Sequence, residues 1–235
     1  MPNGQAHLMV NLGEKEFRTY SGSRSEHQHR QSGVVLAGPH AEPVVIDTRE
    51  QHWLAVVEFH SGGARHFFPL PMSAVCNQVV QLEDIWSRDG RSLRERLLDA
   101  STPESKFRVF EELLSEHFAP IFDPAIQYAI GGLRGGLPLS HLVSRLGVSR
   151  RTFERRFSAQ VGMTPKRFAR VQRLQRVLRS VRVSSSPDWC TLAAEHGYSD
   201  QAHLIHDFRD LAGITPSGYV PHSSQRSNHV PIAAA

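Results

Sequence analysis

The stretch VSRRTFERRF, near the middle of the chain, combines four arginines with two phenylalanines. On a helix of 3.6 residues per turn, Phe153 and Phe157 share one face, while Arg151 and Arg155 project from the opposite face. Arginine presents a fork of donors that suits guanine O6 and N7 or a phosphate, and the neighbouring Glu154 has the acceptors that suit a cytosine amino group. The outer face of this helix therefore has the chemistry to bind a polyanion, and packing on a core does not require it.

The charge is divided unevenly along the chain. Residues 1–130 carry 12 Lys+Arg and 17 Asp+Glu, a net charge of −5, whereas residues 131–235 carry 15 and 6, a net charge of +9. Between Arg150 and Arg182 lie eleven basic residues and one acidic residue. Such a cluster predicts a binding face for a polyanion, and a solvated basic face without a partner is the alternative.

An internal repeat surrounds this cluster. The landmarks of the first copy are Phe153, Phe157, Gly162, Thr164-Pro165 and Phe168, and 51 residues later the chain has Leu204, Phe208, Gly213, Thr215-Pro216 and Tyr219. Upstream, LVSRLGVS matches LAAEHGYS with a shift of 50 residues. In each copy we expect a short helix that ends at Gly147 or Gly197 and a second helix capped by Ser149 or Ser199. Two such helices joined by a short glycine turn form a helix-turn-helix.

The second helix of a helix-turn-helix enters the major groove of DNA, so the repeat predicts two reading helices. In the first copy we expect base contacts from Arg151, Glu154 and Arg155, and backbone contacts from Arg150, Arg156 and the Ser149 helix start. The exposed face of the second copy presents the following residues: Ala202 and His206 in the centre, flanked by His203, Ile205 and Arg209, with Ser199 at the helix start.

The second copy is predicted to be the weaker reader, because Asp200 and Asp207 make that helix less attractive to DNA. The alternative is that this copy mainly packs against the first and positions it. Between the copies, Pro165 begins an amphipathic helix over 164–181 whose length is about 27 Å at 1.5 Å per residue. This helix sets the separation of the two readers, and its arginines have either DNA phosphates or groups of the protein as partners.

The repeat carries a resemblance to a known family. Residues 128–221 resemble the DNA-binding domain of the AraC family of bacterial transcription regulators, through LGVSRRTFERRFSAQVGMTPKRF, RLQRVL and LAAEHGYSDQAHLIHDFRDLAGITPSGY. The resemblance implies two reading helices in successive major-groove segments, which fall on Arg151, Glu154 and Arg155 and on Ala202, His203 and His206. The chain departs from the family at Leu204, where a phenylalanine is usual, and in the long polar segment VSSSPDWC.

The first half of the chain predicts a small β-rich domain. Short β-branched or alternating runs over 6–12, 33–38, 43–47 and 52–60 predict strands of an antiparallel sheet or barrel up to about residue 85. Two helices are expected within 86–122, the second opened by Pro103. The segments VVEFHSGGARHFFPLPMSAV and QLEDIW resemble the partial cupin-like sensor domain of one branch of AraC-type regulators.

The fold is thus expected to be α+β, with a sensor or dimerisation domain over 1–122, a DNA-binding domain over 128–221 and a disordered tail over 222–235. We expect a cytoplasmic, sequence-specific transcription regulator, with activator among the roles considered. Its expected partner is double-stranded DNA, with RNA polymerase, a small-molecule effector inside the barrel and a second copy of the chain as further candidates. The two cysteines and the absence of a signal peptide or membrane-spanning run favour a reducing compartment.

No enzyme, cofactor or metal site is predicted. Among the histidines of the first half, only His27 and His29 are closely spaced, and they fall in a stretch, 21–33, that is expected to be a polar loop. The competing hypothesis is a cupin-like small-molecule binding protein or enzyme with a basic tail that binds nucleic acid without selectivity. Two reading helices at a fixed separation favour the regulator, because non-selective binding does not need them.

Overall fold

The computed structural model describes residues 1–21, 27–46, 52–181, 187–219, 228 and 230. Its strands are β1 (Ala6–Asn11), β2 (Glu16–Ser21), β3 (His27–Ser32), β4 (Val34–Ala37), β5 (Val45–Ile46), β6 (Leu54–Phe59) and β7 (Val79–Gln81). Its α-helices are α1 (Glu83–Asp99), α2 (Pro103–Glu116), α3 (Pro124–Arg134), α4 (Leu139–Leu146), α5 (Arg150–Val161), α6 (Pro165–Val181), α7 (Trp189–Glu195) and α8 (Gln201–Ala212). Short 3-10 turns are η2 (Ala64–His66), η3 (Met72–Val75) and η4 (Pro216–Gly218).

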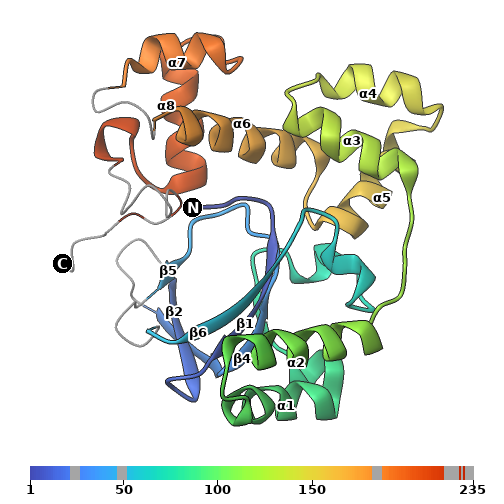
Figure 1. Ribbon diagram of the computed structural model, residues 1–235. Coiled ribbons are helices and arrows are strands. Elements are labelled where there is room, and N and C mark those ends of the chain that lie inside the picture. Colours follow the sequence, from blue (N-terminus) through green and yellow to red (C-terminus); the bar gives the residue numbers. More distant parts are fainter. Residues whose placement is uncertain (22–26, 47–51, 182–186, 220–227, 229, 231–235) are drawn as a thin grey trace.

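The strands form two antiparallel sheets, one in the order β6, β1, β4, β7 and the other in the order β3, β2, β5. Strand β1 pairs with both of its neighbours, and Leu8 lies opposite Leu36 on β4 and Val57 on β6. Leu8, Val10 and Leu36 have no exposed surface, so the interior on this face of the larger sheet is filled with aliphatic side chains. Helices α1 and α2 lie beside this sheet, where Leu93 and Leu113 are fully buried (Figure 1).

The helices α3 to α8 form a second apolar cluster, separate from the one around the sheets. Figure 1 shows α6 as a rod with α3, α4 and α5 around one end and α7 and α8 around the other. We call residues 1–122 the N-terminal part and α3 to α8 with the following turn η4 the helical part. The two parts together confirm the α+β class.

Several elements differ from the sequence-based expectation. Strands β2, β3 and β7 were not expected, and the stretch 21–33 is not simply a polar loop, because His27–Ser32 pairs with β2. Its polar composition suits an outer strand, since β3 ends the order of its sheet and its side chains need not all face a core. The helix expected from 86 begins at Glu83, and Pro103 opens α2 as expected, with Thr102 as its cap.

Candidate nucleic-acid interface

The first helix-turn-helix consists of α4 and α5. Gly147 ends α4 with a φ of 62°, a left-handed conformation that glycine adopts without steric cost, and Ser149 caps α5 by accepting a hydrogen bond from the Thr152 amide at 3.3 Å. Phe153 and Phe157 are buried, with ring centroids 5.7 Å apart. The inner face of α5 is thereby fixed to the core, and the expected turn and cap are both present.

The outer face of α5 carries two unengaged arginines. The side chains of Arg151 and Arg155 are exposed, and within the described part of the chain neither makes an ion pair or hydrogen bond. Arg150 pairs with Glu154 along the helix, with 2.8 Å between Nε and Oε1. Arg156 turns inward, and its Nε donates to Asp123 Oδ2 at 2.8 Å.

Asp123 also accepts from the Ile126 amide at 3.3 Å as the cap of α3, so Arg156 fastens α5 to the start of α3. This engagement gives Arg156 a role inside the helical part.

The second helix-turn-helix consists of α7 and α8, and its cap differs from the expected one. Ser199 does not cap α8: Asp200 does, by accepting from the His203 amide at 2.7 Å, while Ser199 Oγ donates to the Asp200 carboxylate at 3.1 Å. These hydrogen bonds, that from the His203 amide foremost, hold the pKa of Asp200 below its ordinary value. The cap was misplaced by one residue because the shift between the copies changes from 50 to 51 residues at this point, so Asp200 and not Ser199 corresponds to Ser149. A carboxylate at this position satisfies the helix N-terminus at least as well as a hydroxyl.

The outer face of α8 is mostly uncharged. Gln201, Ala202, His206 and Arg209 are exposed. Gln201 was not predicted as exposed, because the helical period places it on the stripe of Leu204 and Phe208; it lies in the first turn of α8. His203 instead turns back, with its ring centroid 5.1 Å from that of the buried Tyr198 at 83°.

Asp207 was expected to face the solvent and to weaken the attraction of α8 for DNA, but it is buried. Its side chain is 3% exposed and lies between two arginines of α6. Arg170 donates from Nε and Nη2 to Asp207 Oδ1 at 2.9 and 2.7 Å, and Arg173 Nη2 donates to Oδ2 at 3.1 Å. Burial alone lowers the pKa of Arg170, but its hydrogen bonds and charge pairing with Asp207 outweigh this and raise it. The carboxylate therefore connects α8 to α6.

This connection, which we call the Asp207 clamp, includes neighbouring contacts. Asp210 accepts from Arg167 at 3.0 Å and from Arg170 at 2.7 Å. Arg173 lies 4.3 Å above the centre of the Tyr198 ring and donates to the Gly197 carbonyl at 3.0 Å. Burial, followed by the nearby Asp207 charge, raises the pKa of the Tyr198 phenol. A signal for the clamp exists in the sequence, because Asp207 stands at a core position of the stripe that contains Leu204, Phe208 and Leu211.

Most arginines of α6 thus have partners within the protein. Arg176 donates to the carbonyl of Arg134 at 2.9 Å, and its pKa is lowered by burial and by the nearby Arg173 and Arg179. Lys166 and Arg179 remain exposed on this helix. Of the two readings of the linker helix, internal pairing is the one that the structure shows for Arg167, Arg170, Arg173 and Arg176.

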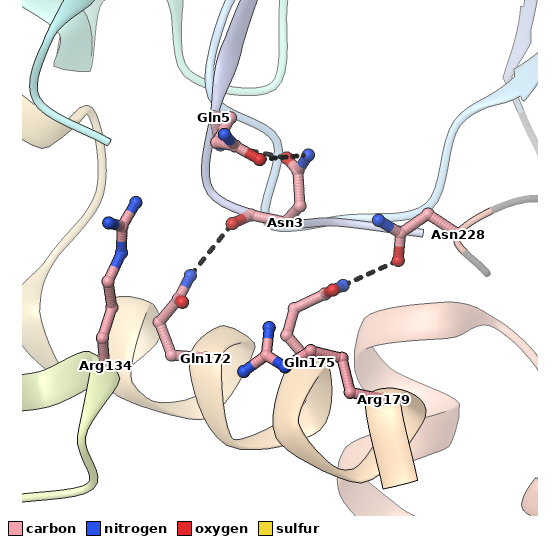
Figure 2. A pocket seen from close by; sticks show the side chains of 7 residues that line it. All are labelled: Asn3, Gln5, Arg134, Gln172, Gln175, Arg179 and Asn228. Atoms are coloured by element: carbon pink, nitrogen blue, oxygen red, sulfur yellow. Dashed lines mark hydrogen bonds between the residues drawn. The ribbon is translucent and has the colours of Figure 1, made fainter. Parts of the chain in front are cut away.

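The helical part is docked on the N-terminal part. Residues 1–5 run along α6, where Gln172 donates to the Asn3 carbonyl at 2.9 Å and Gln175 to the Pro2 carbonyl at 2.7 Å. Arg134 at the end of α3 donates to Ser61 at 3.0 Å. A polar pocket of about 300 Å³ lies in this interface, and Figure 2 shows its lining: Asn3, Gln5, Arg134, Gln172, Gln175, Arg179 and Asn228.

Among the described residues, the histidines of the N-terminal part are spread over several elements. Within the residues that the structure describes there is no group of three or more His, Cys, Asp or Glu side chains placed to hold a metal ion. His29 lies on β3 opposite Thr19 of β2. Both cysteines are free thiols, with Cys76 half-buried and Cys190 exposed. Among the described helices, none is long and apolar enough to cross a membrane.

The repeated geometry, two capped helices projected from one rigid core by a connecting helix, defines a DNA-binding protein with a double helix-turn-helix. Residues 142–221 match the sequence family described as "Helix-turn-helix domain", and residues 1–81 match a domain of unknown function, DUF6597. The helix-turn-helix domain is of the AraC type, and the protein is a DNA-binding transcription regulator.

Crystal structures of ToxT from Vibrio cholerae are similar to the chain. The apo form of a single-residue variant of ToxT is 10% identical, covers 92% of this chain and 88% of its own, and has a TM-score of 0.48. A second crystal structure at 9% identity has the same coverage and a TM-score of 0.46. ToxT bound to (E)-4-(8-methylnaphthalen-1-yl)but-3-enoic acid is 10% identical, covers 93% and 95%, and has a TM-score of 0.43. No curated protein sequence matches the chain.

Proposed function

We propose that the chain reads a two-part DNA site, with α5 and α8 in successive segments of the major groove. Residues 1–122 act as a sensor or dimerisation domain and residues 128–221 as the DNA-binding domain. The observation that carries this proposal is the pair of outward helix faces on one core, one of which presents two exposed arginines without partners in the described structure.

In the first reader, Arg151 and Arg155 contact base edges, because they are the exposed and unengaged cations of α5. Glu154 contacts a base only when its ion pair with Arg150 is broken. Arg150 and the Ser149 helix start contact phosphates. The Arg150 side chain is 71% exposed, so its ion pair with Glu154 is weak and Arg150 can bind a phosphate instead. We assign Arg156 to structure rather than to DNA, because Asp123 holds it.

In the second reader, the contacts come from the exposed face of α8. Ala202 is small enough to approach a thymine methyl, and Gln201 offers the amide that pairs with adenine N6 and N7. His206 and Arg209 lie further along the same helix and contact base or phosphate. His203 supports the helix from within through Tyr198, and Ser199 supports the Asp200 cap.

The test is selection of bound fragments from random DNA, followed by footprinting of the best fragment at physiological salt. We expect an enriched sequence with two protected major-groove segments. Arg155→Ala is expected to relax the preference at one base position and to cost about 1–3 kcal/mol of binding free energy. The control is Lys15→Ala, which removes an exposed cation from the turn between β1 and β2. Binding without any enriched sequence, and with an affinity that only falls as salt rises, would favour the basic-tail hypothesis.

We further propose that an effector acts at the interface pocket rather than inside the sheets. The interior beside β1 and β4 is filled by fully buried aliphatic side chains, whereas the interface pocket is lined by polar groups. Arg134 and Arg179 have no carboxylate partner among the described residues, and Gln172 and Gln175 add amide groups (Figure 2). This lining suits a small anion with a carboxylate or phosphate group.

The pocket is tested with inorganic phosphate against chloride at matched ionic strength. We expect phosphate to raise the melting temperature of the wild-type chain and to change its DNA affinity, because the anion bridges the two parts. Arg179→Gln is expected to abolish both effects, and Arg108→Gln to retain them. An equal response of the wild type and Arg179→Gln would assign the phosphate effect to another surface.

Pairing of two chains is proposed through α1 and α2. Leu98 is 43% exposed and Phe107 66% exposed on these helices, so apolar surface is available there for a second chain to cover. Sedimentation of the full chain is expected to show a dimer that Phe107→Ser weakens. Contact with RNA polymerase, which an activator requires, is tested by transcription from a promoter that carries the selected site.

A further inference from the structure

Residues 38–44 connect β4 to β5, and we call their first six residues, GPHAEP, loop 38–43. It belongs to the N-terminal part in sequence but enters the helical part in space. Ala41 is 3% exposed and lies in the apolar cluster of the helical part, among side chains of α3 to α8.

Loop 38–43 reaches the C-terminal ends of both reading helices. Gly162 ends α5 with a φ of 96°, and a Cβ atom there would lie 2.7 Å from Cγ of Pro39. Gly213 ends α8 with a φ of 73°, and a Cβ atom there would lie 3.4 Å from Cγ of Pro43. The two proline rings of one loop therefore abut the two corresponding helix ends of the repeat.

The middle of the loop is held from both sides. On the helical side, Arg167 Nη2 donates to the Ala41 carbonyl at 2.7 Å, while its Nη1 donates to Asp210 of α8 at 3.0 Å. On the N-terminal side, the Ala41 amide donates to Asn77 Oδ1 at 2.7 Å, and the Asn77 amide donates to the Pro39 carbonyl at 3.1 Å. Arg167 is thus shared between the loop and the second reader.

The mechanical consequence follows from the way the two readers are joined. Helix α6 is about 25 Å long and joins the two helix-turn-helix units at its ends. A single connecting helix resists rotation of one unit relative to the other about the α6 axis only through the side-chain packing at each end. A second connection away from that axis opposes the rotation. Adjacent base pairs are displaced by about 3.4 Å and rotated by about 34–36°, so a small rotation of one reader changes the spacing that it fits.

We propose that loop 38–43 is a positioning element that fixes α8 relative to α5, with Arg167 and Asn77 as positioning residues, and that it thereby sets the spacing between the two halves of the DNA site. The proposal rests on the proposed function, because it needs two readers on one duplex. It also gives the N-terminal part a direct route to DNA specificity, since any movement of β4 or β5 is transmitted to both helix ends.

The experiment measures binding to a set of duplexes that carry the two selected half-sites with the intervening spacer lengthened or shortened by one or two base pairs. The variants are Arg167→Ala, with Lys166→Ala as the control that removes a charge from the adjacent exposed position, and Asn77→Gly, with Gln78→Ala as its control. Glycine keeps the positive φ of 59° at position 77 while it removes the side-chain acceptor. Binding to a single isolated half-site is measured in parallel.

For the wild type we expect one preferred spacer length. A spacer that is one base pair longer or shorter is expected to lower the affinity about tenfold or more, as the loss of one good base contact does. Arg167→Ala and Asn77→Gly are expected to flatten this profile to about threefold or less, with single half-site binding and sequence preference unchanged. Both controls keep the wild-type profile. A profile as sharp as that of the wild type in Asn77→Gly, whose change lies outside the helical part, would overturn the proposal even if Arg167→Ala were unstable. A wild type without any two-part site would instead overturn the proposed function.

Discussion

Removal of the Asp207 carboxylate is the perturbation that best separates the charge network of the helical part from its apolar packing. Asp207 is 3% exposed, so its charge is shielded from water, and its partners Arg170 and Arg173 are partly buried at 23% and 20% exposure. Asp207→Ala removes the carboxylate that both arginines share, so that Arg170 keeps Asp210 and Arg173 keeps the Gly197 carbonyl as acceptors. Loss of one partner from a buried ion pair costs about 3–5 kcal/mol. For a chain of this size we therefore expect the melting temperature to fall by about 6–20 °C.

The conservative substitution and an exposed control sharpen this prediction. Asp207→Asn keeps one hydrogen-bond acceptor and is expected to cost about 2 kcal/mol. Asp210→Asn removes a carboxylate from the same arginine cluster, but this side chain is 38% exposed, so we expect a cost of about 1 kcal/mol or less. Denaturant titration followed by circular dichroism gives the three free energies of unfolding. Equal costs at positions 207 and 210 would refute the reasoning, because the difference in burial is its basis.

The same variants are informative on DNA. Because Asp207 connects α8 to α6, Asp207→Asn is expected to reduce protection of the second major-groove segment in a footprint while the first segment stays protected. Protection of both segments at the wild-type level, in a variant that is measurably less stable, would show that the clamp contributes to folding and not to reading.

Three further predictions follow from local geometry. Gly162→Ala is expected to cost about 2–4 kcal/mol by denaturant titration, since it combines a positive φ with a Cβ atom 2.7 Å from a proline ring, whereas Gly147→Ala, with open space around it, costs about 1–2 kcal/mol; equal costs would contradict this. Ser149→Ala removes the α5 cap and is expected to cost about 1 kcal/mol, with Ser149→Thr as the conservative control. Burial above all lowers the pKa of His40, so the contribution of His40 to stability is complete above the ordinary histidine pKa of about 6.5 and declines as pH falls below that value. Between about pH 7.5 and 5.5, the free energy of unfolding should therefore fall less steeply in His40→Gln than in the wild type. The same slope in both proteins would assign the effect to other groups.

Local sequence was enough to predict the two helix-turn-helix units. The repeat predicted both pairs of helices, and Pro165 predicted the start of α6, because a glycine turn, a cap and an apolar stripe of period 3.6 are each encoded within a few residues. The α+β class and four of the strands also followed from local alternation. Strands β2 and β3 were missed because their alternation is weak and their order in the sheet depends on a partner strand.

The partners of charged side chains were decided only by the tertiary structure. In the sequence, nothing distinguishes Arg170 and Arg173 from arginines that bind phosphates. In the structure, both donate to Asp207, which lies 37 and 34 residues away along the chain. The Ala41 carbonyl is 126 residues from Arg167. Periodicity records which face of a helix is apolar but carries no information on which distant group meets its polar face. By itself the sequence determined that this protein has two helix-turn-helix units. Only the packing of distant segments decided which arginines remain exposed on their outer helices and which loop meets the C-terminal ends of both helices.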